Sequence, residues 1–153
     1  MRVKFWIGFA LTVAIVVLGI LVSGGQPIVF VDIPSLAIVI LIPAAIAFAS
    51  WPVRDIGRAF SALYDEGASR MELEKSLLFF DSLRRWMSTA AFMGLMIGLV
   101  SILRYYTGNE TGKLGPNLAV MLLCNASALF FMLLVPLPLA SLARRRLVEA
   151  RGE

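Results

Sequence analysis

The run LGPNLAVMLLCNASALFFMLLVPLPLASLA, Leu114–Ala143, decides the class of fold because no Asp, Glu, Lys or Arg interrupts it. A helix of about 20 consecutive apolar residues crosses the ~30 Å hydrocarbon core of a bilayer, and this run is longer than that. Three more uncharged blocks precede it, at Phe5–Val31, Ile33–Val53 and Trp86–Leu103. The sequence therefore predicts an all-α membrane protein with four transmembrane helices.

The four helices divide the chain into membrane segments and one short soluble segment. We expect a single domain over residues 1–153, with transmembrane helices at 5–22, 33–51, 86–104 and 115–141, a cytoplasmic helical segment at 53–85 and a cytoplasmic tail at 142–153. The apolar part of the first block exceeds the 7–15 residues of a secretory signal, so we expect a retained helix that forms a hairpin with the second.

The basic residues predict the orientation. With the amino terminus in the cytoplasm, only Arg104 and Lys113 of the 14 Lys and Arg residues lie outside, as the positive-inside rule requires. Both termini are then cytoplasmic. The run ARRRLVEAR directly follows a helix end, so we expect it to meet the headgroups of the lipid bilayer and not a nucleic acid.

The composition argues against an enzyme and against a metal site. The chain has no His, and its one cysteine, Cys124, excludes an internal disulfide. No nucleophile–base pair or paired carboxylates at helical spacing stand out. We therefore expect no catalytic residue, no cofactor and no bound metal.

Several local patterns predict how the helices begin, bend and pack. Ser69 and Glu72 form a capping-box pattern, and no Gly or Pro lies between Ala68 and Gly94, so the helix that starts there can run straight into the third membrane segment. Pro136 and Pro138 predict a kink in the fourth.

Small residues on the third membrane helix predict close packing. Gly94 and Gly98, with Ala91 beside them, form a small-residue stripe that lets two helix backbones approach. The partner could be another helix of the same chain or a second subunit. Asp32 is expected to start the second membrane helix; the alternative is that it attracts cations at an outer mouth.

Two stretches resemble a known family. GLVSILRYYTGNETGKLGPNLAVMLLCNASALFFMLLVPLPLASLARRR, Gly98–Arg146, resembles the last two membrane helices of the flagellar stator subunit MotA and, more distantly, TolQ and ExbB. SGGQPIVFVDIPSLAIVI, Ser23–Ile40, resembles the first hairpin of that family. The resemblance covers most of the chain, in the same order and topology.

The resemblance implies a homo-oligomeric ring, a pentamer, in the bacterial inner membrane. Such a ring surrounds a dimer of a MotB- or ExbD-like protein whose single membrane helix carries an essential Asp, and ions pass between the two. The family's proline in the third membrane helix falls here at Ser88, and its threonine falls at Leu95. The cytoplasmic segment is much shorter than in MotA, so the rotor-contact surface is carried over to no residue of this chain.

Asn125 sits in the middle of the fourth membrane segment, where it must face protein or water. It either makes an interhelical hydrogen bond or lines an ion path with Ser127. Ser127 and Pro138 fall on nearly one face of a straight helix, whereas Asn125 lies about 160° round from Ser127. The candidates for an ion path are therefore Ser88, Asn125, Ser127 and Pro138.

These observations support three hypotheses. The first is a MotA-like ring subunit of an ion-driven stator or motor complex, since the chain has no acid at membrane depth and a partner must supply one. The second is a ring-forming scaffold of the same fold that conducts nothing. The third is an unrelated four-helix membrane adaptor.

Overall fold

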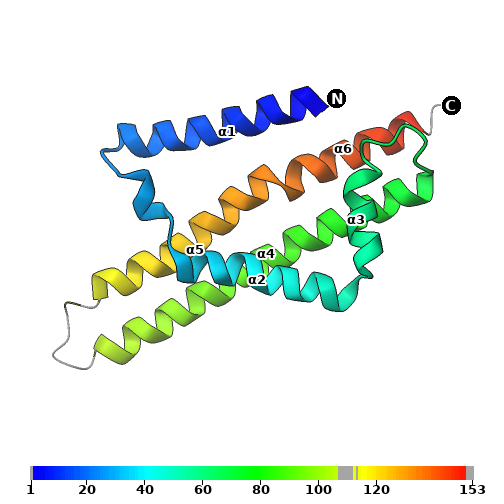
Figure 1. Cartoon of the computed structure of the whole chain (residues 1–153). Helices are drawn as coiled ribbons and strands as arrows, with labels where there is room; N and C mark the ends of the chain where they lie inside the picture. The colour runs from blue at the N-terminus through cyan, green and yellow to red at the C-terminus, as the bar shows by residue number, and fades with distance from the viewer. Residues whose placement is uncertain (1, 107–111, 113, 151–153) are drawn as a thin grey trace.

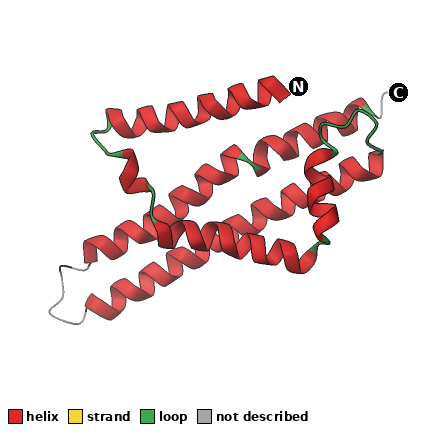
Figure 2. Ribbon diagram, in the orientation of Figure 1, coloured by secondary structure: helices red, strands yellow, loops and turns green. Residues whose placement is uncertain are grey.

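The computed structural model describes residues 2–106, 112 and 114–150, and the regular elements in these ranges are all helices (Figures 1 and 2). They are α1 (Arg2–Val22), the 3₁₀ helix η1 (Pro27–Phe30), α2 (Ile33–Ser50), α3 (Val53–Ser61), α4 (Arg70–Tyr106), α5 (Leu114–Leu134) and α6 (Pro136–Glu149). Four helical stretches of the described chain are long and apolar enough to cross a membrane. The predicted all-α class and the number of candidate membrane spans are confirmed.

The third candidate span belongs to one unbroken helix. α4 has 37 residues and runs from the predicted cytoplasmic segment through 86–104, as the absence of Gly and Pro before Gly94 predicted. Its amino terminus is closed by the predicted capping box: the Ser69 N–H donates to Glu72 Oε2 at 2.8 Å, and the Glu72 N–H donates to Ser69 Oγ at 3.3 Å. The second half of the cytoplasmic segment and the third membrane segment are therefore one continuous helix.

The fourth candidate span is divided between two helices. α5 ends at Leu134, α6 starts at Pro136, and Val135 between them has φ −119° and ψ −75°. Pro136 and Pro138 have no N–H, so the helical hydrogen bonds to residues 132 and 134 cannot form. The predicted kink is confirmed, and the helix resumes through Glu149, beyond the predicted boundary at 141.

α4 and α5 pack closely along the small-residue stripe of α4. A Cβ added to Gly94 would lie 2.8 Å from the Cβ of Cys124, and one added to Gly98 would lie 2.6 Å from the Cβ of Met121. Real Cβ atoms do not approach so closely, so only glycine fits at these two positions. The stripe is therefore used within the chain, where it brings α4 against α5.

Two apolar clusters lie along this helix pair. The first joins α2, α4 and α5 through Val39, Met87, Ala91, Cys124, Ala128 and Met132. The second joins the end of α2 with α3, α4 and α6 through Ala47, Ala59, Leu63, Leu73, Phe79, Phe80, Leu139, Ala140 and Ala143. α2 and α3 thus cover adjoining parts of the α4 rod.

The first helix differs from the others because little of it packs against this core, although Phe5 near its start contacts the second cluster. None of the span Phe5–Val22 is buried, and α1 contacts mainly α5 and η1 (Figure 1). α1 and α2 run in opposite directions, as expected for a hairpin, but η1 and the turn at Gly24, with φ +74°, separate them, so that they make few contacts with each other (Figure 1). α1 offers nearly its whole surface to lipid or to another chain.

Replacing Gly98 with alanine should destabilise the protein by about 1–3 kcal/mol, a usual cost of overpacking. The new Cβ would also lie 3.1 Å from the Met121 Cα, and backbone cannot move aside as a side chain can. The matched control is Gly19→Ala on α1, where an added Cβ meets nothing within 4 Å. Thermal unfolding in one detergent compares the two, and equal midpoints would contradict the close α4–α5 contact.

Candidate functional site

The side-chain amide of Asn125 is bonded to its own helix. Its Nδ2 donates to the Met121 carbonyl at 3.2 Å, one turn earlier on α5, and the residue is half-buried. An interhelical bond from this amide, as the packing interpretation expected, is not formed in the described part of the chain. Asn125 is thus partly satisfied and partly accessible.

The other ion-path candidates occupy different environments. Ser127 is buried, with 8% of its surface exposed, Pro138 is half-buried at the start of α6, and Ser88 is exposed on α4. A single copy of the chain therefore does not gather the four candidates into one lining. The position of Ser127 suits helix packing, and Ser88 and Asn125 are the two whose side chains another helix could reach.

Ser35 is a buried polar residue whose role the sequence did not reveal. Its hydroxyl donates to the Val120 carbonyl at 3.4 Å, and the Cys124 thiol donates to the Ser35 carbonyl at 4.0 Å, so α2 and α5 are joined by two weak polar contacts. Its N–H donates to Asp32 Oδ2 at 2.9 Å. Asp32 therefore caps α2, as expected for a helix start; a serine within an apolar helix was the only available signal for Ser35.

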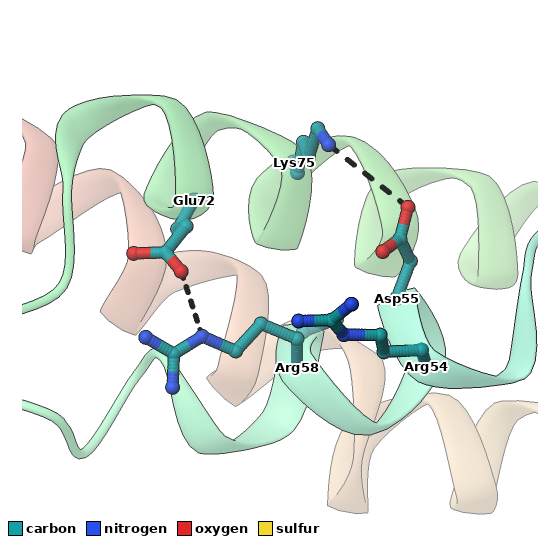
Figure 3. Close-up of a pocket in the computed structure, with 6 residues that line it drawn as sticks. Arg54, Asp55, Arg58, Glu72 and Lys75 are labelled. Carbon is teal, nitrogen blue, oxygen red and sulfur yellow. Dashed lines mark hydrogen bonds and ion pairs between the residues drawn. The ribbon is translucent and has the colours of Figure 1, made fainter.

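Charged residues gather where α3, the turn after it and the start of α4 meet. Arg58 Nε donates to Glu72 Oε1 at 2.7 Å (Figure 3). Arg58 Nη2 also lies 3.1 Å from Asp65 Oδ2. The hydrogen bond from Arg58, with two further bonds from Ser69, lowers the pKa of Glu72 to about 2, and the same pairing raises the pKa of Arg58. Glu72 lies well before Trp86 and outside the expected membrane segment.

α6 reaches the same junction from the other end of the chain. Arg146 Nη1 donates to the carbonyls of Ala62 and Asp65 at 3.0 and 2.9 Å, in the turn that follows α3. The Asp65 carbonyl also accepts from the Ala68 N–H at 3.1 Å, so the arginine adds a donor that fastens this turn to α6. The basic tail therefore has a structural role that its composition alone did not indicate.

Asp81 makes a second link between α4 and α6. Its Oδ2 accepts a hydrogen bond from Arg144 Nη2 at 2.8 Å, and its Oδ1 lies 3.7 Å from Arg84 Nη2. The Asp81 side chain is only 18% exposed, less than the other carboxylates at the junction, whereas Arg144 is 59% exposed. In the sequence, the available signal for Asp81 was an acid shortly before Arg84 and Arg85.

The Glu72 carboxylate should stabilise the fold only while it is ionised. Its folded pKa of about 2 lies below the ordinary 4.5, so the contribution is present above about pH 4.5 and is lost as the pH falls towards 2. Glu72→Gln keeps a capping-box side chain and removes the charge. We expect the thermal unfolding midpoint of Glu72→Gln to lie below that of wild type at neutral pH. The two midpoints should converge as the pH falls from about 4.5 towards 2.

Glu74→Gln is the matched control, because Glu74 is half-exposed and pairs only with the exposed Arg70. Its difference from wild type should be smaller, as surface ion pairs contribute little. A Glu72→Gln difference that stays constant down to about pH 2 would show that packing, and not charge, is what the variant removes.

Chemically, the described residues offer hydrogen bonding and ion pairing and no gathered metal ligands. No group of three or more His, Cys, Asp or Glu side chains comes together within the described ranges. Comparison with protein-family models, curated proteins and solved structures gives no match to this chain. The chain is an all-helical protein whose four long apolar helices are those of a multi-pass membrane protein.

Proposed function

We propose that the chain is a MotA-like wall subunit of an ion-gradient-driven stator or motor complex in the bacterial inner membrane, with both termini in the cytoplasm. Several copies, five by the family resemblance, would form a ring around a dimer of a single-span partner whose membrane helix bears an Asp. The chain itself would hold and guide that helix without binding the ion alone.

The observation that carries this proposal is a rigid helix pair with no carboxylate in its expected membrane segments. α4 and α5 are held together at Gly94 and Gly98, α4 is unbroken from the soluble segment onward, and the expected membrane segments contain no Asp or Glu. A proton path through hydrocarbon needs an ionisable group at depth. Such a pair can form a wall, and the ion-binding group has to come from another protein.

Uncovered faces support an oligomer. No residue of the apolar span of α1 is buried, and α5 exposes a row of leucines. The leucines are Leu118, Leu122, Leu129 and Leu133. The exposed side of α4 is also apolar at Phe92, Ile97 and Val100, and nearer the soluble segment it carries Ser88 and Thr89. In a ring, the apolar faces would meet lipid and neighbouring subunits, and the Ser88 side of α4, with Asn125 of α5, would be available to the central helix.

A non-conducting ring scaffold is the second candidate. Ser127 is buried, and the Asn125 amide already has an acceptor on its own helix, so neither needs an ion or a partner carboxylate. Leu95, at the family's threonine position, has no coordinating atom. This function shares the ring and the rigid helix pair with the first and differs only in transport.

Native mass spectrometry of the particle purified from its own membrane tests the assembly. We expect several copies of the 16.7 kDa chain, five if the resemblance holds, together with the mass of a smaller single-span protein. A monomer or a simple dimer would contradict both ring functions. A ring without the second protein would support the scaffold.

Proton flux into vesicles that contain the purified complex tests transport. Asn125→Leu and Ser88→Leu should each lower the flux by about tenfold if a polar contact worth roughly 1–2 kcal/mol is lost from the path. Thr12→Leu is the matched control, since Thr12 lies on the separate helix α1 and bonds to the Gly8 carbonyl. Equal flux in all three variants would contradict an ion path along α4 and α5.

A further inference from the structure

A pocket of about 210 Å³ lies between α3 and the first turns of α4 (Figure 3). It is lined by Arg54, Asp55, Arg58, Ala59, Glu72 and Lys75. Three of the six carry a positive charge and two carry a negative charge. The volume far exceeds the ~15 Å³ that one water molecule needs, so the pocket has room for a small polar group.

The two acids do not saturate the three cations. Arg58 is engaged by Glu72 and by Asp65, which lies outside the lining. Lys75 Nζ is 3.9 Å from Asp55 Oδ2, beyond hydrogen-bonding distance, so its N–H donors are not used by that carboxylate. The Arg54 side chain has no hydrogen bond or ion pair within the described part of the chain. Arg54 and Lys75, from opposite walls, therefore present unused donors to the pocket.

The position of the pocket relative to the apolar helices suggests its ligand. α2 ends at Ser50, and Trp51 packs edge-on against Phe79 of α4 with ring centroids 5.6 Å apart. Lys75 lies four residues before Phe79, about 6 Å along the helix. Tryptophan is enriched at the membrane interface, so Arg54 and Lys75 fall at the depth of lipid headgroups.

The neighbouring surface is amphipathic. Val53, the first residue of α3, is 69% exposed beside Arg54, and Met71 and Leu78 are also exposed on α4. α3 runs across the direction of α4 instead of along it (Figure 1). A short helix that lies across the membrane helices, with apolar and basic side chains together, suits the boundary between acyl chains and headgroups.

We propose that this pocket binds the phosphate of an anionic phospholipid headgroup. Arg54 would offer its planar fork of N–H donors and Lys75 its ammonium group, and both make charge-assisted hydrogen bonds with phosphate oxygens. Asp55 and Glu72 hold the walls in place and select against ligands of higher negative charge. The site requires only that α2 ends at the membrane surface. The proposal of a lipid site is therefore independent of the proposal that the chain forms a ring.

Native mass spectrometry of the full chain released from nanodiscs tests the site. The nanodiscs contain phosphatidylcholine with or without phosphatidylglycerol, and wild type should retain phosphatidylglycerol selectively. Arg54→Gln and Lys75→Gln should each reduce the retained phosphatidylglycerol about fivefold, the usual effect of one basic residue at an anionic surface.

Arg85→Gln is the matched control. Arg85 is exposed on α4, and among the residues described its side chain makes no hydrogen bond or ion pair. Arg85→Gln therefore removes the same charge as Arg54→Gln, but outside the pocket. If Arg85→Gln retains as much phosphatidylglycerol as wild type, the pocket is supported as the binding site. If it loses as much phosphatidylglycerol as Arg54→Gln, the retention depends on general surface charge, and the proposed site is overturned.

Inorganic phosphate distinguishes a lipid from a soluble ligand. It is added to the protein in phosphatidylcholine nanodiscs, and the unfolding midpoint is compared with that in nanodiscs containing phosphatidylglycerol. Stabilisation by phosphatidylglycerol alone supports the lipid site. Equal stabilisation by inorganic phosphate, lost in Arg54→Gln, would overturn the lipid in favour of a soluble phosphate compound.

Discussion

The close contact of α4 with α5 is the constraint on which the remaining structure depends. In a bilayer the hydrophobic effect does not drive helices together, because lipid is as apolar as leucine, so close backbone approach has to supply the attraction. Gly94 against Cys124 and Gly98 against Met121 provide that approach. α2 joins the pair through Val39, which is fully buried, and these three helices form the core at membrane depth.

Because α4 is unbroken, its packing against α5 also fixes the position of its charged residues at the junction with α3 and α6. One rod runs from Arg70 to Tyr106, so its position against α5 also sets where Glu72 and Lys75 lie relative to α3. Arg146 of α6 donates to the carbonyls that follow α3, and Arg144 binds Asp81 on α4. Three segments far apart in sequence thus meet at one end of the molecule.

The distribution of polar groups fits the supporting role in ion movement that we propose. At membrane depth the polar side chains are uncharged and mostly bonded to backbone carbonyls, as with Asn125 and Ser35. The charged residues lie outside the apolar segments. Some of them fasten turns, and Arg54 and Lys75 line the pocket. A group that changes its protonation inside the hydrocarbon is the one chemical element that a partner would have to add.

The sequence by itself determined the class of fold. Four long uncharged blocks are too apolar to remain exposed to water, so they favour a bilayer. In lipid a single segment can satisfy all of its backbone hydrogen bonds only as a helix, so four apolar helices follow from composition and length. Local chemistry also determined the Asp32 cap, the capping box at Ser69 and the break at Pro136, because each depends on residues within one helical turn.

Only the tertiary structure decided which faces meet. Helical periodicity placed Ser127 and Asn125 on different sides of one helix, but it could not say that Ser127 turns inward, because that depends on how α5 rotates against α4. The sequence also could not predict the sparse packing of α1, the contacts of Ser35 with α5 or the hydrogen bonds of Arg146 to the turn after α3. Each depends on contacts between residues far apart in the chain, and no local preference encodes such contacts.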